Sequence, residues 1–217
     1  MNVLGRVRAQ LRGILPARLR RAVHSLRATI GSEQKILFHA PRGALRELHA
    51  RTRVHYREGT IDDLRRLDSD NDYDPGTIQL MTRHLAEGDR LVLGEEDGAV
   101  SFSGWICVGA IELPRARVSL PPGLVYAYKL HSRADRRGAG LMRGFYGYVA
   151  RELLAPEIEA VLAAVVVGNV ASEQAHQNAG FARVGRFWDV HLGKAALAIT
   201  DRGVGARIGR RVVTSYG

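Results

Sequence analysis

The chain has 217 residues, 46% of them hydrophobic, and a formal net charge of +10 at pH 7. This length and apolar content suit one domain with a single sizeable core. A membrane-spanning protein is excluded, since no stretch reaches the roughly 18 uninterrupted apolar residues of a bilayer span.

The start of the sequence and its single cysteine bear on location. Residues 1–31 lack the apolar segment and the small-residue cleavage site of a secretory signal. Cys107 has no partner for an internal disulfide, which agrees with a reducing compartment. We therefore expect a cytoplasmic protein with a buried, inert thiol at Cys107. No cysteines and histidines have metal-ligand spacing, so no metal is expected.

The positive charge is concentrated in residues 1–31, which hold seven arginines and no acidic residue. Apolar residues recur there at helical spacing on both sides of Pro16, so we expect two basic amphipathic helices. Three roles stay open for this arm. The first is docking on an anionic membrane surface, such as the inner membrane face. The second is packing on the core or in a homodimer, and the third is binding of nucleic acid. The lack of interleaved aromatic residues disfavours nucleic acid.

From residue 35 onward, short apolar strands alternate with amphipathic helices. Thr60 precedes a helix with two acids in its first turn and is expected to cap it. We expect loops at residues 68–74 and 114–122. The expected strands are residues 35–40, 51–58, 90–95, 99–108, 110–113, 124–130, 160–167, 181–192 and 195–200, and the expected helices are residues 44–50, 61–67, 77–87, 141–154 and 169–179.

This order of elements predicts an α+β fold on a mixed sheet. Composition divides the chain into three parts. We expect a basic amphipathic N-terminal extension over residues 1–50, one domain over residues 51–200 and a Gly/Arg-rich tail over residues 201–217.

The most informative stretch is residues 130–141, Leu-His-Ser-Arg-Ala-Asp-Arg-Arg-Gly-Ala-Gly-Leu, between an expected strand and an expected helix. A basic, glycine-bearing turn at a helix N-terminus presents backbone N–H groups that can hold a phosphate. A P-loop would end in Gly-Lys-Ser/Thr, which is absent here. A dinucleotide fingerprint would need a glycine where Arg143 stands. Neither of these nucleotide motifs fits.

Residues 135–140, Asp-Arg-Arg-Gly-Ala-Gly, resemble the coenzyme A-binding motif Gln/Arg-x-x-Gly-x-Gly/Ala of the GNAT superfamily of N-acetyltransferases, with Asp135 in place of Gln or Arg. Residues 169–181 are similar to that family's Asn-x-Ala-Ser…Gly-Phe segment, at the expected distance after a buried strand. The resemblance covers about residues 51–200. It implies a mixed, mostly antiparallel sheet flanked by helices. The fourth and fifth strands, residues 124–130 and 160–167, would splay apart around the pantetheine arm.

The resemblance also implies acetyl-CoA, or another acyl-CoA, as the cosubstrate and an amine as the acceptor. Backbone groups near residues 130–132 would pair with the pantetheine, and those of residues 136–141 would hold the pyrophosphate. Glycines allow a close approach there, and the helix N-terminus and arginines add positive potential. The implied cofactor-binding residues are Leu130, His131, Ser132, Arg136, Arg137, Gly138, Ala139, Gly140, Leu141, Asn169, Ser172 and His176.

Direct transfer to an amine needs a proton acceptor for the amine and a proton donor for the departing thiolate. The family's usual donor, a tyrosine, is matched by His176, which acts as the acid or only contacts the cofactor. For the base, Glu112, Tyr126, Tyr128 and His131 all stay open. The resemblance thus implies an N-acyltransferase. The alternative is a regulatory or scaffold module of the same fold that binds coenzyme A without turnover.

Overall fold

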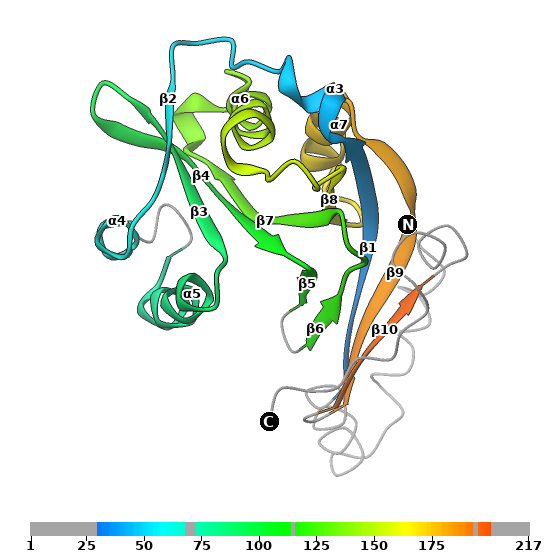
Figure 1. The fold of residues 1–217 in the computed structure, drawn as a ribbon. Helices are drawn as coiled ribbons and strands as arrows, with labels where there is room; N and C mark the ends of the chain where they lie inside the picture. Colours follow the sequence, from blue (N-terminus) through cyan, green and yellow to red (C-terminus); the bar gives the residue numbers. More distant parts are fainter. Residues whose placement is uncertain (1–29, 68–72, 114–115, 193–194, 201–217) are drawn as a thin grey trace, which may run out of the picture.

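The computed structural model describes residues 30–67, 73–113, 116–192 and 195–200 (Figure 1). The predicted amphipathic helices, most of the acidic loop at residues 68–74 and the tail lie outside the described residues. The elements follow one another in the order β1 (Ile30–Pro41), α3 (Arg42–Arg46), β2 (His55–Glu58), α4 (Ile61–Arg66), α5 (Pro75–Ala86), β3 (Arg90–Glu96), β4 (Ala99–Val108), β5 (Ala110–Leu113), β6 (Ala116–Ser119), β7 (Leu124–Ser132), the 3₁₀ turn η2 (Ala134–Arg136), α6 (Leu141–Tyr148), the π-helical turn η3 (Val149–Leu153), β8 (Ala160–Val166), α7 (Val170–Asn178), β9 (Ala182–Leu192) and β10 (Ala195–Thr200).

Within the described residues, eight strands form one sheet in the order β10-β9-β1-β8-β7-β4-β3-β2, while β5 and β6 pair separately. Every pairing between these strands is antiparallel except that of β7 with β8. Helices lie on both faces of the sheet (Figure 1). The predicted fold class, an α+β mixed and mostly antiparallel sheet flanked by helices, is confirmed.

β1 lies inside this sheet, paired with β8 along one edge and with β9 along the other. The predicted strand covered only residues 35–40, because the residues before it are mostly polar. Within the described residues, the sheet therefore includes the chain from residue 30 onward, which precedes residue 51, the predicted start of the domain. The strand predicted at residues 51–58 is shorter in the structure, where β2 begins at His55. A loop was expected over residues 114–122, but Ala116–Ser119 forms β6, because these residues pair with β5.

The helices on the α4/α5 side begin at side-chain caps. The Thr60 hydroxyl accepts a hydrogen bond from the Asp63 N–H at 3.2 Å, and the Asp63 carboxylate accepts one from the Thr60 N–H at 2.8 Å, which is the predicted cap. Asp74 caps α5 in the same way, with Pro75 in the first turn. This moves the start of α5 two residues ahead of the predicted helix.

Alternation along β3 and β4 divides the core into two layers. On one face, Phe102 and Ile106 of β4 pack with Phe145 of α6. On the other face, Trp105 packs with residues of α4, α5 and β3, among them Leu64. The α6 layer and the α4/α5 layer are thus separated by the sheet, so a group on one face reaches the other only where strands part.

The neighbouring strands β7 and β8 separate part of the way along their length. Their parallel pairing runs from Leu124 with Ala160 to Ala127 with Ala163, yet β7 continues to Ser132 and β8 to Val166. This is the predicted splay of the fourth and fifth strands, and it is confirmed.

A bulge in β7 follows the splay. Lys129 has φ 47°, and the pairing of β7 with β4 shifts register between Ser103 and Trp105. The extra residue changes the alternation, so that Leu130 packs in the α6 layer whereas Tyr128 packs on the opposite face. Side chains on the same parity of β7 therefore point to one face of the sheet before the bulge and to the other face after it.

Candidate functional site

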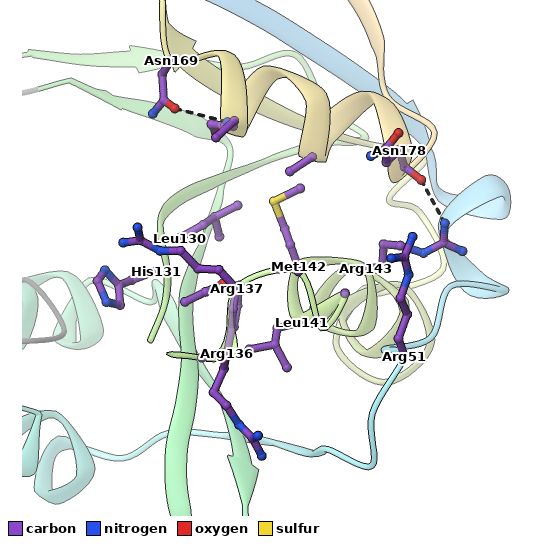
Figure 2. A pocket seen from close by; sticks show the side chains of 17 residues that line it. Arg51, Leu130, His131, Arg136, Arg137, Leu141, Met142, Arg143, Asn169 and Asn178 are labelled. Carbon is purple, nitrogen blue, oxygen red and sulfur yellow. Dashed lines mark hydrogen bonds between the residues drawn. The ribbon is translucent and has the colours of Figure 1, made fainter. Parts of the chain in front are cut away.

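A cavity of about 500 Å³ lies between the β7–α6 turn and α7 (Figure 2). Of the twelve predicted cofactor-binding residues, Ala139 and His176 do not line it. The ten that do are Leu130, His131, Ser132, Arg136, Arg137, Gly138, Gly140, Leu141, Asn169 and Ser172. The sequence motif and the cavity therefore coincide.

The turn at the start of α6 is shaped by two glycines. Gly138 has φ 85° and Gly140 has φ 74°, in the left-handed region that side chains with a Cβ rarely adopt. Gly140 is the N-cap of α6 without any side-chain cap, and the first backbone N–H groups of a helix lack intrahelical acceptors. Those groups, together with the positive end of the helix dipole, make this wall of the cavity suited to an anion.

The arginines around the cavity are not equivalent. Arg136 donates from Nε to Glu96 Oε2 at 2.8 Å, so its guanidinium is held by a buried carboxylate. Burial of Glu96 opposes its ionisation, yet hydrogen bonds from Arg136 and Thr52 keep its pKa below the ordinary value. Arg137 lines the cavity without such an ion pair among the described contacts. The positive charge of Arg136 is thus partly neutralised.

Two further arginines lie apart from Arg136 and Arg137, near Asn178 (Figure 2). The Arg51 N–H donates to the Ala139 carbonyl at 2.9 Å, and the Arg51 side chain lies against Gly140. Arg143 donates from Nη1 to the Asn178 carbonyl at 3.0 Å, at the end of α7. The motif did not reveal Arg51, because it precedes the turn by more than eighty residues.

Asp135, the departure from the family motif, lies outside the cavity lining. Its carboxylate accepts hydrogen bonds from Arg133 at 2.7 and 3.0 Å, and this guanidinium lowers the pKa of Asp135.

Asn169 caps α7, with its Oδ1 accepting from the Ser172 N–H at 3.2 Å (Figure 2). The cap fixes the Asn169 side chain at the cavity wall.

His176 lies in the core beside the cavity. Its side chain is buried and stacks on Phe38, with ring centroids 5.4 Å apart. Nδ1 is 2.7 Å from the Ser172 carbonyl, which can only accept, so Nδ1 carries a proton. Nε2 then accepts from the Tyr146 hydroxyl at 3.0 Å. Burial lowers the pKa of His176 against a smaller opposing effect of the Ser172 bond, so both ring nitrogens of a neutral imidazole are engaged.

The candidate bases lie in different places. Glu112 is on β5, outside the main sheet, and its side chain is not among those described. His131 lines the cavity. Tyr126 and Tyr128 lie on the opposite face with rings stacked at 5.9 Å, as the alternation of the strand predicted. The cavity thus includes only His131 of these four residues.

Two polar residues that the sequence did not single out contact Tyr128. The Tyr128 hydroxyl donates to Asp89 Oδ2 at 2.6 Å and lies 2.9 Å from His84 Nδ1. Asp89 and His84 are 4% and 7% exposed, so this cluster is largely shielded from water. No local pattern marks it, because the three residues come from β7, the start of β3 and α5.

Within the described ranges, no helix is long and apolar enough to cross a bilayer. Among the same residues, no three His, Cys, Asp or Glu side chains gather in a way that could hold a metal ion.

Comparisons with known proteins concern the fold of this chain. No family model and no curated protein matches it. A functionally unknown conserved protein from Staphylococcus epidermidis has a TM-score of 0.55 at 12% identity, over 82% of this chain and 68% of that one. A Drosophila protein has a TM-score of 0.50 at 14% identity, over 81% of this chain and 56% of that one. A protein named as a GNAT-family acetyltransferase, from Novosphingobium aromaticivorans, has a TM-score of 0.49 at 13% identity, over 77% and 68% of the two chains.

Proposed function

We propose that this chain is an acyl-CoA-dependent N-acyltransferase, which moves an acetyl or other acyl group to an amine by direct attack on the thioester. One observation carries the proposal. The cavity of about 500 Å³ is lined both by the glycine turn of α6 and by the part of β7 that has separated from β8. An anion site and a gap between strands thus share one cavity, as coenzyme A requires.

The turn suits the pyrophosphate of coenzyme A. Gly138 and Gly140 leave room for phosphate oxygens to approach the backbone, and the α6 N-terminus directs N–H groups toward them. Arg137 adds a charge on the same wall. Arg51 and Arg143 lie at the Asn178 end of the cavity, where they can meet the phosphate on the adenosine ribose.

The gap between β7 and β8 suits the pantetheine arm. Beyond Ala127 and Ala163 the two strands no longer pair with each other, so their facing edges are available to another chain of amides. Pantetheine contains two amide groups and can lie against such an edge as an added strand does. Leu130 and Ser132, on this part of β7, line the cavity and support the backbone role predicted for residues 130–132.

The acceptor must reach the thioester as a free amine. An alkylammonium of pKa ~10.4 is deprotonated in only about one molecule in a few thousand at pH 7. Recruiting that fraction costs roughly 4–5 kcal/mol, which a well-placed base reduces.

One observation favours the alternative of a coenzyme A-binding module without turnover. His176, which matches the family's usual proton donor, is buried and bonded at both ring nitrogens. A fold that kept the cofactor cavity and lost its acid would look like this. The same observation is compatible with an enzyme whose proton transfers occur on the other face of the sheet.

Release of coenzyme A thiol distinguishes the two functions. The full chain is incubated with acetyl-, propionyl- and octanoyl-CoA and a panel of amines, and free thiol is measured together with the Kd for coenzyme A. We expect amine-dependent thiol release. Binding with no release for any amine would support the silent module, and failure to bind coenzyme A would reject both functions.

A further inference from the structure

The buried cluster around the Tyr128 hydroxyl joins three elements on the face opposite α6. Tyr128 Oη lies 2.6 Å from Asp89 Oδ2 and 2.9 Å from His84 Nδ1, while His84 Nδ1 and Asp89 Oδ2 are 3.4 Å apart. Tyr128 is half-buried, and its two partners are buried. Tyr128 is therefore the least buried member of this cluster.

The protons in this cluster can be assigned. A phenol has one proton, and in the Tyr128 hydroxyl that proton is donated to Asp89. His84 Nδ1 must then donate, because the Tyr128 oxygen has no second proton to offer. His84 thus holds the Tyr128 oxygen from one side while the Asp89 carboxylate accepts from the other. A hydroxyl held in this way can take up a proton as it passes its own inward.

The position of Tyr128 follows from the strand register. Ala127 and Ala163 are the last paired residues of β7 and β8, so Tyr128 is the first residue of β7 beyond the pairing. Its side chain lies on the α5 side of the sheet, away from the cavity wall formed by α6 and α7. An acyl group that passed through the gap between the strands would therefore reach the face that carries Tyr128.

We propose, resting on the proposed function, that Tyr128 is the catalytic residue that receives the proton of the acceptor amine and passes its own proton to Asp89. His84 is a positioning residue that fixes the Tyr128 oxygen. The amine nitrogen forms a bond to the thioester carbonyl carbon while the C=O π electron pair moves onto the oxygen, and one N–H proton of the nitrogen moves to Tyr128 as the Tyr128 proton moves to Asp89.

The reverse movement completes the reaction. The oxygen electron pair re-forms the C=O bond as the C–S bond breaks, sulfur keeps the electron pair of that bond, and the proton on Asp89 returns through Tyr128 to the thiolate. The products are an amide and a thiol, with no other reactant. The return is favourable, because a carboxylic acid is ordinarily a stronger acid than a thiol. The Tyr128 hydroxyl then serves as both the base and the acid. The role of acid is the one that the buried His176 cannot fill.

The first test is kinetic and uses the amine that supports the fastest thiol release. Tyr128→Phe and Asp89→Asn are expected to lower kcat by about 10²–10³ and to change the pH–rate profile, since general acid–base catalysis contributes about that much. The Kd for coenzyme A should stay within about twofold, since the cluster lies outside the cofactor cavity. The titratable groups that face Tyr128 are His84, Asp89 and Tyr126.

Tyr73→Phe is the matched control. It removes another buried tyrosine hydroxyl on this face, which accepts from Trp105 Nε1 at 2.6 Å, and it leaves the Asp89–Tyr128–His84 cluster in place. We expect kcat within about threefold of wild type and an unchanged pH profile, as for a buried hydrogen bond that contributes only to stability. Normal kcat and pH profile in Asp89→Asn and Tyr128→Phe would overturn the proposed proton relay, which runs from the amine through Tyr128 to Asp89.

A second test does not depend on turnover. Nitrogen NMR of His84 in the free protein should show a ring proton on Nδ1, and Tyr128→Phe should shift that signal. A neutral His84 with its proton on Nε2 would overturn the relay, because Tyr128 would then donate to His84. If the wild-type protein releases no thiol with any amine, the proposed function fails. If it releases thiol and the variants behave like wild type, only the relay is rejected.

Discussion

The two faces of the splayed sheet are built from different chemical groups. On the α6/α7 face, the cavity relies on backbone N–H groups, glycines and arginines at its walls. On the α5 face, the polar groups are the side chains of Asp89, Tyr128 and His84, which are hydrogen-bonded to one another. The first arrangement can hold a large anion, and the second can move a proton.

In the proposed function, this difference would separate cofactor binding from proton transfer. Backbone N–H groups keep their charge distribution at every pH, which suits the α6/α7 face to binding an anion. The Tyr128 cluster instead consists of side chains and lies at the first β7 residue beyond the pairing with β8. Variants on the two faces should therefore change different measured quantities.

The largest expected effect on binding comes from a variant at the cavity on the α6/α7 face. Gly140→Val places a β-branched residue at φ 74°, where the added Cβ would also lie 3.1 Å from the Arg51 side chain. Backbone strain of about 1–3 kcal/mol must be relieved by moving the turn, so we expect the affinity for coenzyme A to fall about 10- to 100-fold. Titration calorimetry measures the Kd.

Gly109→Val is the control for that variant. Gly109 has φ 77°, and nothing lies within 4 Å of its added Cβ. It carries similar strain at a turn that does not line the cavity. We expect a comparable loss of stability with the Kd for coenzyme A unchanged. An equal loss of affinity in both variants would mean that the Gly140 effect is general destabilisation.

The second expectation concerns His176, which is buried on the α6/α7 face of the sheet. His176→Phe removes bonds to the Tyr146 hydroxyl and the Ser172 carbonyl, so the free energy of unfolding should fall by about 1–3 kcal/mol at pH 7.5. Burial lowers the pKa of His176, so below the ordinary value of about 6.5 the unfolded chain binds a proton that the folded chain does not.

The sign of the pH effect follows from that pKa. The His176 contribution to wild-type stability is complete above about pH 6.5 and is lost as the pH falls toward the folded-state pKa, by up to about 1.4 kcal/mol per pH unit. Urea unfolding between pH 7.5 and 5 should show a smaller decline in His176→Phe than in wild type. An equal decline in both proteins would show that His176 titrates normally.

The cavity on the α6/α7 face was predictable from sequence because many of its lining residues fall in two short motifs. Gly138, Gly140 and Asn169 belong to two short motifs, and the structure places them on one cavity. The Tyr128 cluster was not predictable, since Asp89 and His84 are 39 and 44 residues away from Tyr128 in the chain. Only the tertiary fold brings them together.

Two other features also depended on tertiary packing. Helical spacing placed His176 on α7 correctly but did not show that the ring is buried against Phe38. Strand alternation predicted a shared face for Tyr126 and Tyr128. It did not reveal the bulge at Lys129, which turns Leu130 to the α6 face. A change of face inside a strand has no signature in the polar and apolar pattern.

A smaller effect is expected at the Asn178 end of the cavity. Arg51→Gln removes a guanidinium whose backbone is fixed by the Ala139 carbonyl, and we expect about tenfold weaker binding of coenzyme A, as for one charge-assisted contact. Binding of 3′-dephospho-coenzyme A should change much less. Arg65→Gln, which alters an exposed ion pair with Asp62, is the control and should leave both Kd values unchanged. Equal losses for the two ligands would place the Arg51 contact elsewhere on the cofactor.

The smallest effect is expected where the sequence departs from the family motif. Asp135 is exposed and paired with Arg133 outside the cavity lining, so its negative charge lies in water and is screened. Asp135→Gln restores the motif residue and should tighten coenzyme A binding by about two- to threefold at low salt, with the difference vanishing near 0.5 M salt. Titration at both salt concentrations measures this. A tenfold gain that persists in high salt would mean that Asp135 contacts the phosphates directly, and that the turn moves when the cofactor binds.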